Sequence, residues 1–332
     1  MVITKTPFRM SFFGGGTDLE EFYSEYGGAV LSTTFNKYCY VTVRKLPEFF
    51  TYKNELVYSK IERVNSIEDI EHPLIRNCMK FLGIHNIRLT YDADLPARTG
   101  LGTSSSFAAG MLNAFHTLRG EAIDKRKLAD EAIFAERVLC AEAGGIQDQI
   151  AASFGGLNHI EIKADGYNVK PIILSRSRKK LLNDSLMLFF TGFSHMSFQV
   201  HEKIKENFQN KIRRLLKMKD MVKEAEDILT SKSDLDEFGR LLHESWKIKR
   251  SLSQNVSTDA IDEMYERALS NGALGGKLLG SGGGGFLLFY VNPDRRNYLK
   301  KALSDLLYIP FEFESGGSRI IYYSEESNED KI

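Results

Sequence analysis

The chain has 332 residues, enough for two domains, because single hydrophobic cores rarely grow much beyond about 250–300 residues. Its hydrophobic content of 42% and charged content of 27% are typical of globular proteins and exclude the disordered and fibrous classes. Lys+Arg and Asp+Glu both number 44, so no net charge attracts nucleic acid or a membrane surface.

The cysteines and the apolar runs give information about the compartment. The three cysteines, Cys39, Cys78 and Cys140, are odd in number and far apart, which excludes a metal-binding pattern and favours free thiols in a reducing cytosol. The N-terminal residues lack a basic head followed by a long apolar stretch, and no run approaches the roughly 20 apolar residues of a membrane span. We therefore expect a cytoplasmic protein.

The first half of the chain alternates between strand and helix patterns. Strands are predicted over 1–13 and 28–46, separated by a run of three glycines, and a hairpin is predicted in 49–60. Another strand is expected at 86–92, after which the hydrophobic period becomes helical. The remaining elements are helices over 104–118 and 125–142, a short helix ending at 154–156, and a strand over 157–163.

A domain boundary is predicted in 164–184, where glycine, proline and a basic run occur together. A buried strand at 186–192 and a long amphipathic helix from about 198 to 229 follow, and mixed charges on the helix favour a solvated face over a nucleic-acid surface. The other predicted elements are helices over 233–252, 258–270 and 293–307, a glycine-rich turn over 272–285, and strands over 286–291, 311–314 and 318–323. This pattern predicts an α+β protein with domains 1–170 and 171–332.

The most informative segment is a glycine-rich helix start, in which Gly100-Leu101-Gly102 precedes four hydroxyl residues and an apolar helix. The unpaired N–H groups of a helix N-terminus and its partial positive charge favour phosphate binding, and Arg98 adds a full charge. An ordinary capped helix is the alternative, but a cap needs only one hydroxyl. The segment has neither the Gly-Lys-Ser/Thr of a Walker A loop nor a Rossmann glycine pattern.

Residues 96–106 resemble the second motif of the GHMP kinases, with Arg98 where many members have glycine and Thr103 where serine is usual. Residues 6–19 resemble the first motif of that family, and residues 275–285 resemble the third. The similarity extends from residue 5 to about 290. It implies an ATP-dependent small-molecule kinase with two domains, the first like ribosomal protein S5 domain 2 and the second ferredoxin-like.

The resemblance assigns roles in nucleotide binding and catalysis. Asp148, in a Gly-x-x-Asp-Gln segment, corresponds to the catalytic base, although an aspartate there could also cap a helix. Glu136 and Ser104 correspond to Mg²⁺ ligands, and the alternative for Glu136 is a salt bridge with Arg137 or Arg126. The implied ATP-binding residues are Arg98, Gly100, Leu101, Gly102, Thr103, Ser104, Ser105 and Ser106.

The first and third motifs are implied to hold the acceptor. Arg9 corresponds to the basic residue that faces the transferred phosphate, and Asp18 to the aspartate that binds acceptor hydroxyls. Alternatively, residues 14–18 are only a turn with a helix cap. The implied acceptor-binding residues are Arg9, Gly14, Gly15, Gly16, Thr17, Asp18, Asp148, His195, Gly282 and Gly283.

Within the family, the first two motifs are most similar to the D-glycero-α-D-manno-heptose-7-phosphate kinases, which make the 1,7-bisphosphate for GDP-heptose biosynthesis. That branch implies ATP and a phosphorylated heptose as partners, no nucleic acid or membrane, and is compatible with a homodimer. The sugar's own phosphate requires a second anion site, and His195, next to Thr191-Gly192, is the best-placed candidate for it. The full set of candidates is Ser194, His195, Ser197, Lys247, Lys249 and Arg250. The alternatives are a free-sugar kinase similar to L-fucokinase or galactokinase, and a non-catalytic ligand-binding protein, which would be expected to lose Asp148 or Glu136.

Overall fold

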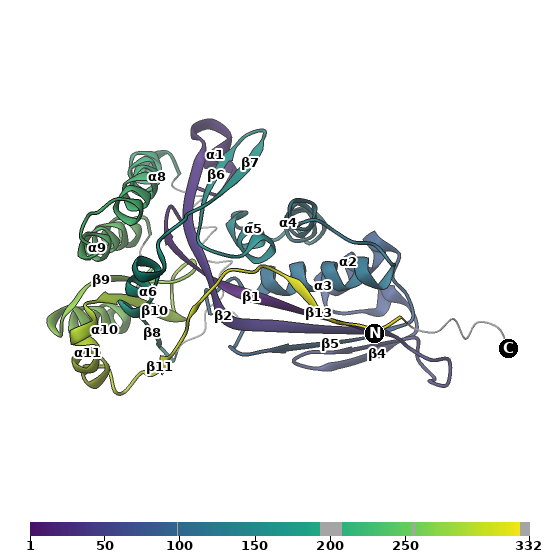
Figure 1. Cartoon of the computed structure of the whole chain (residues 1–332). Helices are drawn as coiled ribbons and strands as arrows, with labels where there is room; N and C mark the ends of the chain where they lie inside the picture. Colours follow the sequence, from purple (N-terminus) through teal and green to yellow (C-terminus); the bar gives the residue numbers. More distant parts are fainter. Residues whose placement is uncertain (98, 193–207, 254–255, 326–332) are drawn as a thin grey trace.

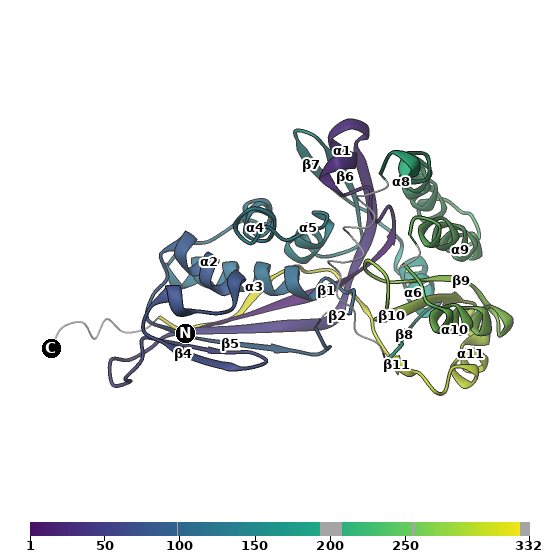
Figure 2. The same ribbon diagram turned by 180° about the vertical axis from the view of Figure 1, so that it is seen from behind.

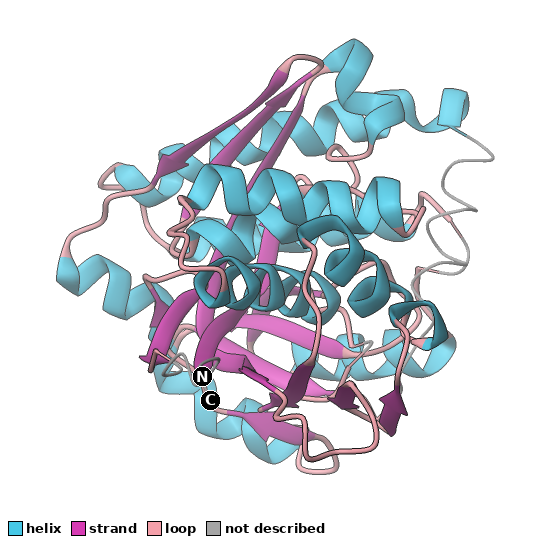
Figure 3. Cartoon of the chain, turned by 90° about the vertical axis from the view of Figure 1, so that its right-hand side faces the viewer, coloured by secondary structure: helices cyan, strands magenta, loops and turns pink. Residues whose placement is uncertain are grey.

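The computed structural model describes residues 1–97, 99–192, 208–253 and 256–325. One half of the molecule is a large sheet with helices over one face, and the other half is a smaller sheet packed with helices (Figure 1). Figure 3 shows helices packed against strands through the whole molecule. The predicted two-domain α+β architecture is confirmed.

The large sheet is built on two long antiparallel strands, β1 (Val2–Phe13) and β2 (Gly28–Lys45). Burial alternates over the first residues of β1 and is continuous after Thr6, because there the strand is covered on both faces. The sheet order is β13-β1-β2-β5-β3-β4, with β6, β7 and β12 paired off this path. The other strands are β3 (Asn54–Val57), β4 (Ile61–Val64), β5 (Ile87–Ala93), β6 (Asn158–Lys163), β7 (Gly166–Pro171), β12 (Phe313–Glu314) and β13 (Arg319–Tyr323).

Helices cover one face of this sheet, and the central one is α3 (Thr103–Leu118) (Figure 2). Nearly all side chains of α3 are buried, which explains why its sequence is apolar or small on every side. At Gly110 a Cβ would lie 2.8 Å from Thr6 Oγ1, so glycine allows α3 to approach β1 closely. The neighbouring helices are α2 (Pro73–Leu82), α4 (Lys125–Ile133) and α5 (Gln147–Phe154), whereas α1 (Glu20–Tyr26) lies apart from them beside β6 (Figure 1).

The second half contains an antiparallel sheet in the order β11-β8-β10-β9. Its central strands are almost fully apolar because helices and the first half of the chain bury them. The strands are β8 (Leu186–Phe190), β9 (Ala273–Leu278), β10 (Phe286–Val291) and β11 (Leu307–Ile309). The helices are α6 (Arg176–Asp184), α8 (Phe208–Thr230), α9 (Asp236–Arg250), α10 (Asp259–Ser270) and α11 (Arg296–Ala302).

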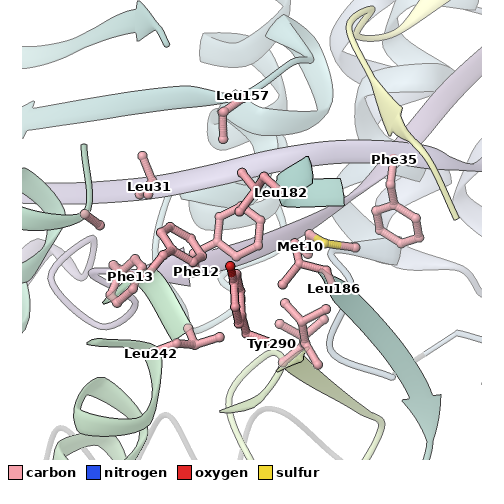
Figure 4. Packing of buried hydrophobic residues seen from close by; sticks show 14 of the residues in the cluster. Met10, Phe12, Phe13, Leu31, Phe35, Leu157, Leu182, Leu186, Leu242 and Tyr290 are labelled. Atoms are coloured by element: carbon pink, nitrogen blue, oxygen red, sulfur yellow. The ribbon is translucent and has the colours of Figure 1, made fainter. Parts of the chain in front are cut away.

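One hydrophobic core joins the two halves (Figure 4). The rings of Phe12 and Phe13, at the end of β1, pack edge-on against Phe238 of α9 at centroid distances of 5.4 and 5.2 Å. Tyr290 of β10 lies in the same cluster. The end of β1 is therefore held rigidly against α9, which fixes the first glycine motif relative to the second half of the chain.

Two predicted elements of the first half differ in the structure. The predicted hairpin in 49–60 is wrong in position, because β3 and β4 turn at 58–60. The buried Asn54 begins β3 and accepts a hydrogen bond from the Ile87 N–H. The predicted boundary segment 164–184 contains β7, paired with β6, and α6, which is capped by Ser175.

In the second half, the predicted turn over 272–285 begins with a strand, β9. Its glycines serve packing, because a Cβ at Gly275 would lie 2.0 Å from the Gly239 carbonyl oxygen of α9. The helix predicted over 293–307 ends at Ala302 and is followed by β11. No helix within the described ranges has the length and apolar character needed to cross a membrane.

Candidate active site

The three glycine-rich segments meet at one place although they lie far apart in the sequence. A Cβ at Gly100 would lie 2.4 Å from the Leu279 carbonyl oxygen, and one at Gly280 would lie 2.4 Å from Gly100 Cα. The backbone N–H of Arg9 donates to the Leu101 carbonyl oxygen at 3.1 Å. The second and third motifs are therefore in direct backbone contact, and β1 is bonded to the second.

Arg9 and Asp148 form a double hydrogen bond at this meeting point. Nε and Nη2 of Arg9 donate to the two carboxylate oxygens, each at 2.7 Å, and Nη1 donates to the Gly100 carbonyl oxygen at 2.5 Å. The Arg9 side chain is 6% exposed and the Asp148 side chain 24% exposed. Charged, bidentate bonds of this kind are strong and directional, so the carboxylate is held in a fixed orientation with one side open.

The start of α3 lies beside this pair. A Cβ at Gly102 would lie 3.1 Å from Arg9 Cγ and 3.4 Å from Asp148 Oδ2, so a side chain there would crowd the pair. Gly102 is the N-cap residue with φ +72°, and no side chain caps the helix. The amides of the first turn therefore remain available to an anion next to Asp148.

The four hydroxyl residues at the start of α3 have different environments. Ser104 is exposed, whereas Thr103, Ser105 and Ser106 are buried. Ser105 Oγ donates to Glu136, and Ser106 Oγ donates to the Pro7 carbonyl oxygen at 3.0 Å. Two of the four hydroxyls therefore stabilise the loop from inside, and Ser104 is the one open to solvent. Leu101 is fully buried in the core.

Glu136 lies in a π-helical turn, Phe134–Leu139, where a single helix over 125–142 was predicted. The wider turn places a carboxylate that is 1% exposed against Ser104 Oγ and Ser105 Oγ, both at 2.6 Å, and against Gln149 Nε2. Mg²⁺ prefers hard oxygen ligands and is usually bound by one or two carboxylates together with phosphate and water. The described residues contain no group of three His, Cys, Asp or Glu side chains that could hold a metal ion. A Mg²⁺ ion at Glu136 and Ser104 would therefore need phosphate and water oxygens to complete its ligands.

Asp18 lies on the other side of the α5 N-terminus. It is 3% exposed, and its carboxylate accepts hydrogen bonds from the N–H groups of Gly16 at 2.9 Å and Gln147 at 3.3 Å. Burial and the nearby Asp148 carboxylate raise the pKa of Asp18. The two aspartates are thus close enough to affect each other electrostatically, as expected if both face one ligand.

The first-motif residues around Asp18 shape the loop. At Gly14 a Cβ would lie 1.9 Å from the Ala29 carbonyl oxygen, so this position requires glycine. Thr17 Oγ1 is fully buried and bonds to the carbonyl oxygens of Gly14 and Ala29, each at 2.8 Å. A Cβ at Gly15 would lie 3.8 Å from Gln147 Nε2, and a Cβ at Gly16 would lie 3.3 Å from Leu215 Cδ2 of α8.

The structure places the remaining predicted site residues less directly. Gly282 packs on Val256, and the Gly283 N–H donates to the Val256 carbonyl oxygen at 3.2 Å, so this amide is already paired. Arg98 and His195 lie outside the described residues. Their predicted roles remain predictions.

The sequence analysis missed two glutamines that flank Asp148. Gln147 accepts a hydrogen bond from Ser11 of β1 at 2.7 Å, and Gln149 is fully buried against Glu136. Their position next to Asp148 could have identified them, since residues on either side of a catalytic aspartate at a helix start lie near the same site. Both glutamines hold α5 against the neighbouring motifs.

Gly100→Ala is predicted to destabilise the fold at the contact between the second and third motifs. The added Cβ would clash with the Leu279 carbonyl oxygen, and the backbone has φ +82°. Gly120→Ala is a matched control, because Gly120 has φ +77° but nothing within 4 Å of the added Cβ. We expect Gly100→Ala to lose about 1–3 kcal/mol more free energy of unfolding than Gly120→Ala, measured by urea denaturation. Equal losses would show that the contact is looser than described.

Comparisons with known proteins agree with this geometry. The GHMP kinase N-terminal domain model matches residues 71–156, and the GHMP kinase C-terminal model matches residues 221–309. A D-glycero-alpha-D-manno-heptose 7-phosphate kinase of Campylobacter jejuni is 29% identical over 90% of this chain and 92% of its own length. An L-fucokinase/L-fucose-1-P guanylyltransferase of Bacteroides fragilis is 27% identical over 66% of this chain and 24% of its own length.

Among solved structures, a D-glycero-D-manno-heptose 1-phosphate kinase from Bacteroides thetaiotaomicron superposes with a TM-score of 0.81 and 27% identity. The superposition covers 98% of this chain and 100% of that one. The two matching domain models together span more than half of the chain, in the same order as its two structural halves. The chain therefore belongs to the GHMP kinase family.

Proposed function

We propose that this protein is an ATP-dependent sugar kinase that phosphorylates the anomeric hydroxyl of D-glycero-α-D-manno-heptose 7-phosphate. The product would be the 1,7-bisphosphate, on the route to GDP-heptose. The observation that carries the proposal is the Arg9–Asp148 pair, fixed beside the uncapped N-terminus of α3. The similarity to a kinase named for this substrate supports the choice of acceptor.

In the proposed reaction the sugar hydroxyl attacks the γ-phosphorus of ATP. A new O–P bond forms, the bond from phosphorus to the ADP oxygen breaks, and the hydroxyl proton passes to the Asp148 carboxylate. Each carboxylate oxygen accepts one hydrogen bond from Arg9 and retains a lone pair that can take the proton. Arg9 orients the base and places positive charge where negative charge develops on the phosphoryl oxygens.

The start of α3 is proposed to hold the ATP phosphates through the free amides of its first turn and the Ser104 hydroxyl. Glu136 and Ser104 would hold Mg²⁺, which neutralises phosphate charge when it is bound. The buried bonds from Ser105 and Gln149 keep the Glu136 carboxylate in place. This arrangement aligns the terminal phosphoryl group with Asp148.

Asp18 is proposed to bind hydroxyls of the sugar. Its carboxylate is fixed by the Gly16 and Gln147 amides, and it lies within electrostatic range of Asp148. A carboxylate that accepts hydrogen bonds from sugar hydroxyls favours a sugar over an acceptor that lacks those hydroxyls. With the second kind of acceptor, the buried carboxylate would lose those hydrogen bonds, which is costly. The residues around the catalytic pair thus favour a sugar acceptor.

An acceptor panel tests the proposal. The protein, Mg²⁺ and ATP would be incubated with heptose 7-phosphate, heptose 1-phosphate, free heptose, L-fucose and galactose, and ADP release and the position of the new phosphate would be measured. We expect kcat/KM to be highest for heptose 7-phosphate, with phosphate added at the anomeric oxygen. A preference for a free sugar or for heptose 1-phosphate would show that the proposed acceptor is wrong. If none of these sugars were phosphorylated, the sugar-kinase proposal would be contradicted.

A further inference from the structure

A buried lysine of α9 faces the catalytic pair from the second half of the chain. Lys249 is 7% exposed, and its Nζ donates to the Gly280 carbonyl oxygen in the third glycine motif. Gly280 contacts Gly100, and the Gly100 carbonyl oxygen is bonded to Arg9. The ammonium group therefore lies at the contact of the second and third motifs, next to the Arg9 guanidinium.

The three cations near the end of α9 are in different environments. Lys247 is exposed and donates to Glu244 at 3.1 Å, and Arg250 is paired with Asp262. Lys249 instead points inward, and of the described residues no carboxylate lies within the 4.0 Å of an ion pair. Its one hydrogen bond goes to a neutral carbonyl oxygen. A buried ammonium group without a carboxylate in ion-pair contact is costly. Its position at the site therefore suits an anion that a ligand supplies.

The neighbouring charges do not supply that anion. Arg9 faces Lys249 from β1, and Asp18 and Asp148 face it from the first motif and α5. Asp148 is already paired with Arg9, and Asp18 is bonded to two backbone amides. Lys277 of β9 adds a second buried amine, bonded to the Phe12 carbonyl oxygen at 2.8 Å.

The pKa values of Lys249 and Lys277 agree with this shortage of anions. Burial, followed by the Arg9 charge, lowers the pKa of Lys249 to about 8, while Asp18 and Asp148 oppose that effect. Burial and the nearby cations Lys249 and Arg9 lower the pKa of Lys277 well below its usual range. Lys249 is thus mainly charged at neutral pH, and a bound anion would stabilise that charge further.

An unpaired hydroxyl lies next to the lysine's acceptor. Ser281 follows Gly280, is 7% exposed, and its Oγ has no hydrogen-bond partner among the described residues. A buried hydroxyl without a partner is a second sign that a polar ligand group belongs at this place. The positive charge of Lys249 specifies that this group is anionic.

We propose that Lys249 is a phosphate-binding residue of the site, and that its ammonium contacts anionic oxygens of a phosphate ester bound between Arg9 and the third glycine motif. This inference rests on the proposed kinase function. The ester is either the phosphoryl group in transfer or the phosphate that the acceptor carries, since both present the same oxygen chemistry.

The test compares Lys249→Met with Lys247→Met, which removes an exposed lysine two residues earlier on the same helix. Steady-state kinetics would be measured with heptose 7-phosphate and free heptose, and folding by thermal unfolding. We expect Lys249→Met to unfold at the wild-type temperature or higher, because a buried charge is removed, and to lose roughly 10²-fold in kcat/KM. Lys247→Met should match the wild type.

The pattern of the loss identifies the phosphate. A fall in kcat with both acceptors would support contact with the transferred group, and a fall confined to heptose 7-phosphate would support contact with the acceptor's own phosphate. We expect the kcat/KM of the wild type to decline as pH rises through about 8, where Lys249 loses its charge, and we expect Lys249→Arg to retain part of the activity without that decline. Kinetics of Lys249→Met like those of Lys247→Met, or a loss matched by an equal loss of folded protein, would overturn the inference. An inactive wild type would instead contradict the proposed function.

Discussion

Asp148→Asn should lower kcat by at least roughly 10²-fold while ATP binding stays near the wild-type level. Asparagine has the shape of aspartate but cannot take the proton of the acceptor hydroxyl. The carboxylate lies beside the amides that would hold the phosphates and does not depend on nucleotide for its position, since Arg9 fixes it through two bonds. Rapid-quench kinetics and calorimetric titration with a non-hydrolysable ATP analogue would separate the two effects.

The substitution also removes a partly buried ion pair, so stability needs a control. Asp227→Asn breaks a pair with Lys223 on the exposed face of α8, where the Lys223 Nζ lies 2.7 Å from the Asp227 carboxylate. Exposed pairs of this kind contribute about 0–1 kcal/mol, and this variant should retain full turnover. If folded Asp148→Asn protein also kept near-normal turnover, Asp148 would not be the base.

The sequence predicted the family and the fold because the motifs that identify them are local patterns. Glycines followed by hydroxyls at a helix start can be recognised without knowing what surrounds them. The same pattern could not show which hydroxyl remains exposed to solvent. That depends on α3 being buried on nearly every side, which leaves Ser104 exposed and directs Ser105 and Ser106 inward.

The sequence also could not predict how the helices are oriented, and therefore which side chains point into the site. Residues 247, 249 and 250 are similar cations in one short segment, yet successive helix positions are rotated by about 100°, so they point in different directions. Only the packing of α9 against β1 and β9 directs Lys249 to the site. Similarly, Gly275 was read as part of a turn because its helix contact is not encoded locally.

The roles of the buried carboxylates follow from their surroundings. Asp148 is open on one side and is oriented by Arg9, so a hydroxyl proton can reach its carboxylate. Glu136 is enclosed, and three side chains donate to it, which suits a fixed negative charge. If Glu136 holds the nucleotide's Mg²⁺ as proposed, its removal should change the dependence on metal concentration and not only the maximal rate.

Glu136→Gln should therefore raise the Mg²⁺ concentration needed for half-maximal activity by at least roughly 10-fold, the range found when metal-site residues are altered. The neutral amide attracts the cation less, and its NH₂ group would face donors from Ser105 or Gln149, at a cost of about 1–3 kcal/mol in stability. Activity would be measured against free Mg²⁺ at saturating ATP, well below the unfolding temperature.

Gln149→Met provides the matched variant, because it removes one hydrogen bond to Glu136 and keeps the carboxylate charge. Gln149 is fully buried, and its Oε1 has no partner in the described part of the chain, so methionine loses a single bond there. We expect this variant to be somewhat less stable and to raise the half-saturating Mg²⁺ concentration less than Glu136→Gln does, because the carboxylate loses one of its supports but keeps its charge. If Glu136→Gln responded to Mg²⁺ like the wild type, Glu136 would not be a metal ligand and would only support the loop structurally. A metal ligand cannot lose its charge without a loss of Mg²⁺ affinity.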